Sequence, residues 1–380
     1  MKNHIHLLAD NNIFQLERAL PPGVDLHFFD PDAGLPDNVD CFDALFIRTV
    51  TPVNSETLPV TGNLRFVGAC SAGFDHVDPD YLEDRNIKFS AASGNNSRSV
   101  AEYVCTAMIL YACRKKIKLR DLTIGIIGVG AVGTALQNLL EKMNLRYKCY
   151  DPPREKRDVS FKSCSLQSVL ECEVLTFHVP LTFDGPYKTH RWLDSKKLQN
   201  RSYNLVINSS RGGVADESAL LESKRTGRTD EYILDVWENE PLFRDDSARE
   251  AMITTPHIAG YSLQSKWRAT AITVEALSRY FNLSKPDLSF PSDLVQGSAS
   301  VIQAPDVETL DSFIKKAHPV CRYDSRFRKL IGSEPSDKEK GFSGLRTEFP
   351  YRNEFSFIKT NREILKKYPI LIDLGFSISE

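Results

Sequence analysis

The chain has 380 residues, of which 41% are hydrophobic, and its formal net charge is −2 at pH 7. This length suits two or three domains with well-buried cores, and the small net charge gives no general attraction for nucleic acid or for an anionic membrane surface. An anionic ligand would therefore have to be held by local positive charge.

The chain shows no sign of export or of membrane insertion. Its N-terminus lacks a long apolar core after a basic start, and no later stretch reaches the uninterrupted apolar length of a membrane span. The eight cysteines are scattered without a CxxC pair, which is typical of reduced thiols in a long chain. We therefore expect a cytoplasmic protein with no membrane partner.

The first region alternates short apolar runs, typical of strands, with a stretch of helical periodicity. Polar residues follow two of the expected strands, with Arg48 and Thr49 after one and Ser71 after the other. Ligands of open α/β sheets bind beyond the carboxyl ends of the strands, so these residues are candidates for the wall of a substrate site. The expected strands are 4–8, 24–28, 44–47 and 65–69, and the expected helix is 13–20.

The stretch 122–140, LTIGIIGVGAVGTALQNLL, combines an apolar β-branched run, a glycine turn and helical periodicity. In its GxGxxG motif, Gly128 permits the tight turn, Gly130 lets the backbone approach a pyrophosphate, and Gly133 lets the helix pack on the strand. The first helical turn, which contains Val132, then faces the phosphates. The motif predicts a dinucleotide site, with a structural turn that binds no ligand as the alternative.

A second strand is expected at 145–150, and it is followed by Asp151, 18 residues past the third glycine. An acid at this position accepts hydrogen bonds from the adenosine ribose hydroxyls and repels a 2′-phosphate. It therefore favours NAD over NADP, although Arg154 weakens that preference slightly. We expect NAD as the cofactor.

The alternation of strands and helices continues through the second half of the chain, which is typical of a parallel, doubly wound sheet. A helix at 262–281 should pack back on the first region, so that the nucleotide-binding domain is inserted into a discontinuous substrate-binding domain. The active site is then expected in the cleft between the two domains. Further helices are expected at 97–115 and 217–224, and further strands at 174–178, 205–209 and 232–236.

The composition changes after Asn282, where KPDLSFPSD forms a proline-bearing break. A strand is expected at 300–303 and a helix at 307–316, and the basic residues that follow, Arg322, Arg326, Arg328 and Lys329, are interpreted as a solvated face. The expected domains are 1–96 with 258–285, then 97–257, and finally a small α/β domain at 286–380.

Three polar residues of the second half follow apolar runs and lie near glycine or proline: Arg211, Glu240 and His257. Together they suit the oxidation of a 2-hydroxy acid, which needs a cation for the carboxylate, a base for the hydroxyl proton and a nicotinamide to accept the hydride. Arg211 would clamp the carboxylate, His257 would take the proton, and Glu240 would orient His257 and stabilise its imidazolium form. Taken singly, each has a structural alternative such as a surface ion pair. The remaining histidines show no metal-ligand spacing, so no metal is expected.

These motifs carry a resemblance to a known family. INSSRGGVAD, LDVWENEP and TPHIAG, in this order after GVGAVG and NNSRSVAEYV, resemble the D-isomer-specific 2-hydroxyacid dehydrogenases. The catalytic Arg, Glu and His of that family fall in these motifs, at Arg211, Glu240 and His257. The resemblance implies two flavodoxin-like or Rossmann-like, doubly wound parallel-sheet domains and a homodimer.

One branch of the family is more similar still. It carries segments like IRTVTPVN, FVGACSAGFDHVD, YDPPR, FHVPLTFDGPYKTHRW and HIAGYSLQSK, and it oxidises 4-phospho-D-erythronate during bacterial pyridoxal 5′-phosphate synthesis. The C-terminal extension, with CRYDSRFRK, is similar to the dimerisation domain of that branch. The resemblance therefore implies a small phosphorylated 2-hydroxy acid as substrate.

The same resemblance implies individual ligand contacts. Thr49 and Ser71 each exchange one hydroxyl residue for another, whereas Val179 replaces a hydroxyl residue and could contact the cofactor only through its backbone. Arg48 is a candidate for the phosphate, with a structural ion pair as the alternative, and Arg346, reaching across a dimer, is a second candidate. The implied substrate contacts are Thr49, Ser71 and Tyr261, and the implied cofactor contacts are Asp151, Val179, Asp235 and Gly260.

Two alternative functions stay open. A relative that acts on 3-phosphoglycerate, glycerate or hydroxypyruvate would have the same catalytic residues. An NAD(H)-sensing, corepressor-like binding protein would share the fold and even the catalytic motif, with the third domain as an interaction module. Hydride transfer to NAD with candidate acids distinguishes the enzymes from the sensor.

Overall fold

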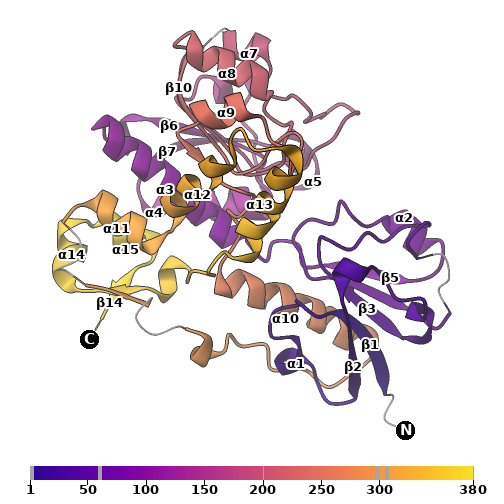
Figure 1. Ribbon diagram of the computed structural model, residues 1–380. Coiled ribbons are helices and arrows are strands. Elements are labelled where there is room, and N and C mark those ends of the chain that lie inside the picture. Colours follow the sequence, from indigo (N-terminus) through magenta and orange to yellow (C-terminus); the bar gives the residue numbers. More distant parts are fainter. Residues whose placement is uncertain (1–3, 59–61, 200, 296–299, 304–307, 380) are drawn as a thin grey trace. The chain divides into compact units, whose positions relative to one another are not determined.

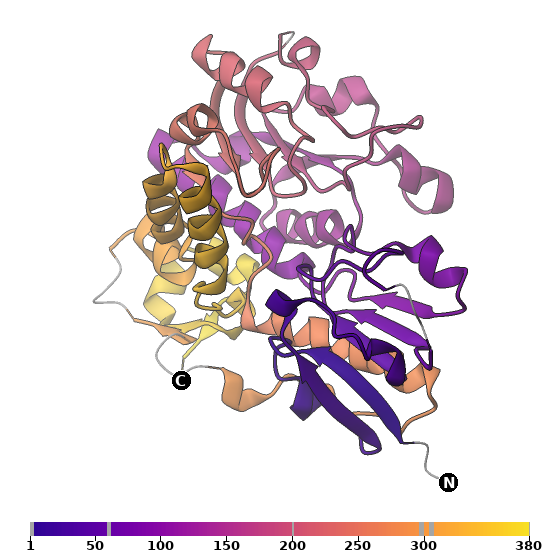
Figure 2. The same ribbon diagram turned by 45° about the vertical axis from the view of Figure 1, so that its right-hand side comes forward.

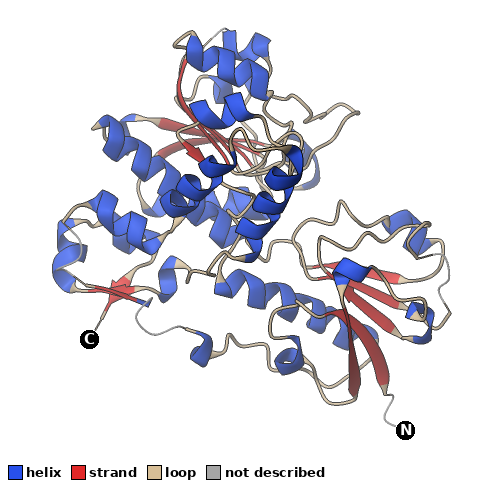
Figure 3. Ribbon diagram, in the orientation of Figure 1, coloured by secondary structure: helices blue, strands red, loops and turns tan. Residues whose placement is uncertain are grey.

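Figures 1 and 3 show the computed structural model, which describes residues 4–58, 62–199, 201–295, 300–303 and 308–379. The chain forms two compact units. The first unit is built from Met1–Asn96 and Leu263–Leu294, and the second from Ser97–Ser262 and Val295–Glu380. The class is α/β with two parallel sheets, as the sequence predicts, whereas the exact domain boundaries stay predictions.

The first unit contains a five-stranded parallel sheet in the order β2–β1–β3–β4–β5. The two strands β3 and β4 are buried along their whole length, as expected of inner strands that are covered on both faces. Helix α10 (Leu263–Tyr280) packs on this sheet through a buried stripe that includes Trp267 and Val274. The strands are β1 (Ile5–Asp10), β2 (Val24–Phe29), β3 (Ala44–Ile47), β4 (Phe66–Ala69) and β5 (Lys88–Ala91).

The helix expected at 13–20 is shorter in the structure, where α1 covers only Leu16–Ala19. Gln15 has a left-handed backbone with a φ of 53°, and two prolines follow at Pro21 and Pro22. The helix therefore neither begins earlier nor extends further. Strand β5 and helix α2 (Pro79–Glu83) were not expected from the sequence.

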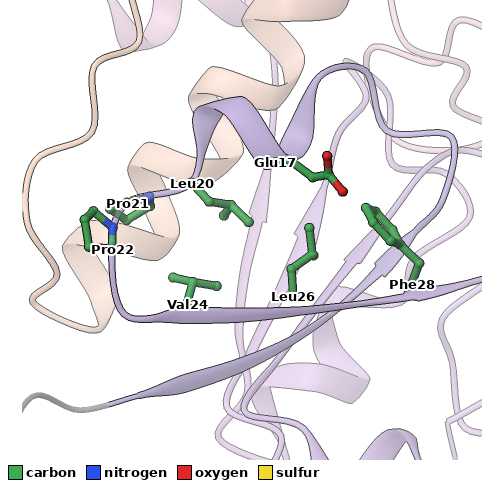
Figure 4. A pocket seen from close by; sticks show the side chains of 7 residues that line it. All are labelled: Glu17, Leu20, Pro21, Pro22, Val24, Leu26 and Phe28. Atoms are coloured by element: carbon green, nitrogen blue, oxygen red, sulfur yellow. The ribbon is translucent and has the colours of Figure 1, made fainter.

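A surface cavity of about 410 Å³ lies between α1 and the edge strand β2 (Figure 4). Apart from the carboxylate of Glu17, its lining is apolar or proline. None of the residues that line it is a predicted site residue. The lining consists of Glu17, Leu20, Pro21, Pro22, Val24, Leu26 and Phe28.

The second unit contains a six-stranded parallel sheet in the order β11–β10–β9–β8–β6–β7. Strand β6 lies between β7 and β8, where the strand order reverses, and the glycine motif follows directly after it. Such switch points are where doubly wound sheets bind ligands. The strands are β6 (Thr123–Ile127), β7 (Arg146–Tyr150), β8 (Val174–Phe177), β9 (Tyr203–Asn208), β10 (Thr229–Leu234) and β11 (Ile253–Thr254).

The longer helices of the second unit agree with the ranges expected from the helical periodicity of the sequence. Helix α3 covers Ser97–Lys115, the range expected, and α8 (Glu217–Arg225) ends one residue later than expected. Strand β10 ends at Leu234, two residues earlier than expected, so Asp235 lies just beyond the strand. The other helices are α4 (Ala131–Lys142), α5 (Pro152–Arg157), α6 (Leu166–Leu170), α7 (Ser195–Gln199) and α9 (Asp245–Glu250).

In its described residues, the C-terminal region adds a small three-stranded parallel sheet, β12–β13–β14, and five α-helices. The helix expected at 307–316 begins at Leu310, after a capping box on Thr309, and the expected start at 307 lies outside the described residues. Helix α11 packs on α3, as both views show (Figures 1 and 2). The strands are β12 (Val301–Ile302), β13 (Lys359–Thr360) and β14 (Ser377–Ile378), and the helices are α11 (Leu310–Ala317), α12 (Val320–Phe327), α13 (Pro335–Thr347), α14 (Arg362–Lys367) and α15 (Ile370–Leu374).

Helices α12 and α13 share a hydrophobic core with the six-stranded sheet. Phe327 stacks on Trp237, with ring centroids 5.0 Å apart. The solvated face expected here is wrong for Arg328, whose guanidinium donates to the carbonyls of Ala248 and Ala251 at the end of α9. The C-terminal region is therefore packed against the loops that follow β10 and β11.

A buried ion-pair network joins α3 to the C-terminal region. Glu102 on α3 accepts hydrogen bonds from Arg352 at 2.6 Å and from Arg98 at 2.7 Å. Glu102 is 0% and Arg352 is 7% exposed. Burial raises the pKa of Glu102, and the two arginines oppose that rise. A pair this deep depends on each partner, because either one alone would be an uncompensated buried charge.

Replacing Arg352 by methionine should lower the free energy of unfolding by about 3 kcal/mol, because the buried Glu102 carboxylate loses one of its two charged partners. Urea unfolding at neutral pH measures the change. The matched control is Arg362→Met on the exposed side of α14, which should stay within about 0.5 kcal/mol of the unsubstituted protein. Equal losses in the two variants would contradict a role of the buried pair.

Candidate active site

The turn that carries His257 is held by one buried carboxylate. Asp235 accepts hydrogen bonds from the Thr255 hydroxyl at 2.6 Å and from the N–H groups of Ile258 and Ala259 at 2.8 and 3.0 Å. The backbone carbonyl of Asp235 accepts from the N–H of His257 at 2.7 Å. His257 has a left-handed φ of 58°, which costs on the order of 1 kcal/mol for a residue with a side chain. Asp235 therefore fixes the backbone beneath His257.

Asp235 was expected to contact the cofactor, and that contact stays a prediction. The residue is 1% exposed. Burial raises the pKa of its carboxyl, against the opposing effects of His257, the Thr255 hydroxyl and the N–H groups of the turn. Its structural role was not foreseen, because the partners are brought together only when β10 and β11 pair.

His257 and Glu240 form a hydrogen-bonded pair. The distance between His257 Nδ1 and Glu240 Oε2 is 2.8 Å, and the other carboxylate oxygen accepts from the N–H of Trp237 at 2.9 Å. Burial alone would raise the pKa of the Glu240 carboxyl, but His257, the N–H of Trp237 and Arg346 together hold it below its ordinary value. With the proton of the neutral imidazole on Nδ1, the opposite nitrogen Nε2 is left to accept a proton.

Arg211 lies in the loop after β9, which presses against the loop that carries Glu240. The next residue, Gly212, has no room for a side chain, because an added Cβ would lie 1.7 Å from the carbonyl oxygen of Trp237. The Asn208 side-chain amide donates to the Arg211 carbonyl at 2.9 Å and so fixes the loop. Sequence reasoning missed Gly212, although the paired glycines after Arg211 were an available signal for close backbone approach.

The three glycines of the GxGxxG motif have different surroundings. Gly128 has a φ of 86°, and an added Cβ would lie 2.5 Å from the carbonyl oxygen of His178. At Gly133 it would lie 2.2 Å from the carbonyl oxygen of Gly128, whereas at Gly130 it would meet nothing within 4 Å. Open space therefore lies at the N-terminus of α4, whose first turn contains the half-buried Val132 and has no side-chain cap. This is the space that a pyrophosphate requires.

Asp151 lies at the end of β7, beside the glycine turn. Its two carboxylate oxygens accept from the N–H groups of Val129 and Arg154, both at 2.8 Å. The Arg154 guanidinium donates to the Val129 carbonyl at 2.6 Å and pairs with Asp158. Arg154, the cation that could have bound a 2′-phosphate, is thus held by other protein groups, so these residues fit NAD. The contact between Asp151 and the cofactor stays a prediction.

Val179 and His178 follow β8 and border the same turn. The side chain of Val179 approaches the Cα of Gly128 so closely that an added Cβ there would lie 2.6 Å from its Cγ1. Burial lowers the pKa of His178 to about 3, so this imidazole is neutral at physiological pH. His178 therefore has a packing role at the turn, and it is a poor candidate for the base.

In the first unit, the expected substrate residues Arg48, Thr49 and Ser71 follow the neighbouring strands β3 and β4. Arg48 Nε donates to the fully buried Asp10 at 2.9 Å, so the ion pair considered as its structural alternative is present. The Ser71 hydroxyl donates to the Gly73 carbonyl at 2.8 Å, and Thr49 is exposed. The carboxyl ends of two parallel strands thus bring the three residues to one edge of the sheet.

Tyr261 follows Gly260 after the His257 turn, and the C-terminal region encloses it. Its ring meets those of Phe349 and Tyr351 edge to face, with centroids 5.7 and 6.1 Å away. The second unit therefore gathers Arg211, Glu240, His257 and Tyr261 from the loops after β9, β10 and β11.

Among the described residues, no three or more His, Cys, Asp or Glu side chains group as a metal site would require. In the same part of the chain, none of the helices has the length and apolar character needed to cross a membrane.

Comparison with known proteins decides the family. Residues 107–259 match the model described as the D-isomer specific 2-hydroxyacid dehydrogenase, NAD binding domain. The erythronate-4-phosphate dehydrogenase of Photorhabdus laumondii is 37% identical over 98% of both chains. That of Marinobacter nauticus is 34% identical over 93% of this chain and 94% of its own. The chain belongs to the D-isomer-specific 2-hydroxyacid dehydrogenase family. It is thus an NAD-dependent 2-hydroxyacid dehydrogenase.

Solved members of this dehydrogenase fold cover a smaller share of the chain. The D-lactate dehydrogenase of Aquifex aeolicus has a TM-score of 0.56 at 24% identity and covers 73% of this chain and 95% of its own. A glyoxylate/hydroxypyruvate reductase of Sinorhizobium meliloti has a TM-score of 0.61 at 19% identity, with 76% and 99% covered. These similarities show the fold alone. They leave about a quarter of this dehydrogenase unmatched, whereas its erythronate-4-phosphate dehydrogenase relatives match nearly all of it.

The glycine motif allows a paired test of cofactor binding. Gly130→Ala should change the free energy of unfolding by no more than about 1 kcal/mol, because its Cβ meets open space. It should nevertheless abolish the rise in melting temperature that NAD causes, since the methyl group occupies the space of the pyrophosphate. Gly133→Ala should destabilise the protein itself by about 2 kcal/mol through overpacking. Undiminished stabilisation of Gly130→Ala by NAD would contradict the assigned site.

Glu217 lies beneath the loop of Glu240. This first residue of α8 is 3% exposed, and its carboxylate accepts from the N–H of Glu238 at 2.7 Å. Burial raises the pKa of Glu217 to about 7, against the hydrogen bond from Glu238, which lowers it. Folding therefore favours the protonated acid, and the stability that this brings is lost as the pH rises from about 4.5 through about 7.

Glu217→Gln should remove this pH dependence, since an amide keeps the accepting oxygen but does not ionise. Relative to the unsubstituted protein, the variant should gain about 3 kcal/mol of unfolding free energy between pH 5 and pH 8. Urea unfolding at the two pH values measures the gain, with Glu363→Gln on the exposed face of α14 as control. A constant offset between the curves of Glu217→Gln and the unsubstituted protein would refute the assignment.

Proposed function

We propose that this dehydrogenase oxidises 4-phospho-D-erythronate to (R)-3-hydroxy-2-oxo-4-phosphooxybutanoate, a step of pyridoxal 5′-phosphate synthesis. The observation that carries the chemistry is the 2.8 Å hydrogen bond between His257 Nδ1 and Glu240 Oε2. Support for the substrate comes from relatives that match nearly the whole chain and are erythronate-4-phosphate dehydrogenases. The proposal includes action in the cytoplasm and a homodimer through the C-terminal region.

Each residue of the trio has one task. Arg211 binds the substrate carboxylate through its planar guanidinium, a geometry that lysine cannot supply. His257 takes the hydroxyl proton on Nε2, and Glu240 stabilises the imidazolium that forms. NAD, when bound at the glycine motif, supplies a nicotinamide that accepts the hydride.

The proton has a path out of the site. His257 becomes an imidazolium when it takes the hydroxyl proton, and it must release that proton before the next turnover. The His257 side chain is 35% exposed, so water can reach the ring, while Glu240 at 24% is more enclosed and keeps its orientation. The pair is thus suited to reversible proton transfer.

The first unit and Tyr261 offer a positive charge for the substrate phosphate and hydroxyl groups for its other oxygen atoms. The acid carries a carboxylate and a phosphate, and Arg48 is the proposed phosphate ligand of the first unit. Its Nε is held by Asp10, which orients the guanidinium and leaves its two terminal nitrogens for a ligand. The ion pair between Arg48 and Asp10 is therefore compatible with phosphate binding by Arg48. The proposed hydroxyl contacts are Thr49, Ser71 and Tyr261.

Replacing His257 by glutamine should lower kcat by about 10² to 10⁴-fold, because the amide cannot accept the hydroxyl proton. The rate is read from NADH absorbance with 4-phosphoerythronate, and NAD binding should be retained. His27→Gln, an exposed histidine of the first unit, is the matched control and should keep full activity. A His257→Gln enzyme with near-normal turnover would exclude His257 as the base.

The same assay separates the alternative functions. With NAD and 4-phosphoerythronate, 3-phosphoglycerate or glycerate, and with NADH and hydroxypyruvate in the reverse direction, kcat/KM should be highest for 4-phosphoerythronate. Comparable values for phosphoglycerate would overturn the substrate assignment and keep the enzyme class. No turnover with any acid, together with NADH-dependent binding of a protein partner, would favour the sensor.

A further inference from the structure

The C-terminal region of the same chain reaches the active-site turn. Phe349 and Tyr351 pack against the ring of Tyr261, and Arg346, in the last turn of α13, lies within hydrogen-bonding reach of the Tyr261 hydroxyl. The sequence makes Arg346 a second candidate, after Arg48, for the substrate phosphate across a dimer, and that role stays a prediction. In the structure Arg346 lies beside Tyr261 of its own chain.

Arg346 also brings positive charge to the catalytic pair. Burial alone would lower its pKa, but Tyr261, Glu240 and Asp235 raise it above the ordinary value. Its Nε is buried and has no hydrogen-bond partner in the part of the chain that the structure describes. The guanidinium lies near enough to the carboxylates of Glu240 and Asp235 to interact with their charge.

The packing of α12 and α13 explains why this contact can be specific. Asp324 on α12 accepts from both the N–H and the hydroxyl of Thr254, at 2.8 and 2.9 Å, directly before the turn of His257. Phe327 stacks on Trp237, whose N–H binds Glu240. Helix α12 is therefore anchored to the loops of Glu240 and His257. Helix α13, which carries Arg346, packs on α12 through Phe342 and Phe327.

We propose that Arg346 is a positioning residue of the active site, supplied by the C-terminal region of the same chain, which holds the Tyr261 hydroxyl and places a positive charge beside the Glu240–His257 pair. The proposal rests on the proposed function, because it concerns the same proton transfer. The family model ends at residue 259, so this contribution comes from outside the NAD-binding domain that the family shares.

The charge balance gives Arg346 a definite effect. Glu240 faces His257, the N–H of Trp237 and Arg346, and it must be ionised to stabilise the imidazolium. Arg346 in turn faces Tyr261, Glu240 and Asp235. Removing the guanidinium makes protonation of the Glu240–His257 pair easier, because a nearby cation favours the ionised carboxylate and disfavours an added positive charge. The enzyme should then lose activity at a higher pH on its acid side.

The test compares Arg346→Met, Arg346→Lys and the control Arg362→Met as full-length proteins with saturating NAD. The acid limb of the pH profile of kcat/KM for 4-phosphoerythronate should move up by about one pH unit in Arg346→Met. Arg346→Lys keeps the charge and should keep the acid limb. Its KM should rise, because lysine lacks the planar fork of arginine and would hold Tyr261, the proposed substrate contact, less firmly. Arg362→Met should match the unsubstituted enzyme.

A second measurement does not depend on turnover. In the protein without substrate, ¹³C NMR of labelled glutamate carboxyls, with Glu240 assigned through Glu240→Gln, should show Glu240 titrating at higher pH in Arg346→Met than in Arg346→Lys. Unchanged titration and an unchanged acid limb would overturn the proposal. A loss of activity in Arg346→Met that occurs with 4-phosphoerythronate and not with erythronate would also overturn it, because Arg346 would then be a phosphate ligand. An unsubstituted enzyme that oxidises no acid would instead refute the proposed function, and the NMR comparison would still decide the role of Arg346.

Discussion

The active site depends on the burial of one carboxylate. Asp235 gathers the hydroxyl of Thr255 and the N–H groups of the following turn, and that turn holds His257 in a left-handed conformation that it would not adopt alone. The hydroxyl of Thr255 is also hydrogen-bonded to the hydroxyl of Tyr103 at 2.7 Å. The backbone carbonyl of Thr255 accepts from the indole N–H of Trp237 at 3.1 Å. Because the backbone N–H of Trp237 in turn binds Glu240, the proposed base and its proposed orienting acid rest on a single network.

That arrangement has an energetic cost that the rest of the second unit offsets. Asp235 and Glu217 are acids whose burial raises their pKa, and His257 has a backbone that a side chain disfavours. Apolar packing compensates, since a buried aromatic side chain contributes about 1.5–3 kcal/mol. Phe327 of the C-terminal region supplies such packing directly against Trp237. The C-terminal region thus stabilises the loops on which catalysis would depend.

Sequence reasoning placed residues correctly after strands, because that information is local. Arg211, Glu240 and His257 each follow an apolar run, and the polar residue after a strand of a parallel sheet lies at its ligand-binding edge. The glycine motif was predictable for the same reason, since the conformation of Gly128 is local. Of the α-helices described in the C-terminal region, only α11 was expected, and α12 to α15 were missed. Helix α13, PSDKEKGFSGLRT, contains two glycines and little apolar periodicity, so its stability comes from tertiary contacts.

What the sequence could not supply are pairings between distant segments, and these decide the electrostatics of the site. The requirement for Gly212 arises from the carbonyl of Trp237, and the position of Arg346 arises from the packing of α13. Burial alone would raise the pKa of the Glu240 carboxyl, but His257, the N–H of Trp237 and Arg346 hold it below the ordinary value. These groups come from three separate segments of the chain, so only the folded structure keeps the carboxylate ionised beside His257.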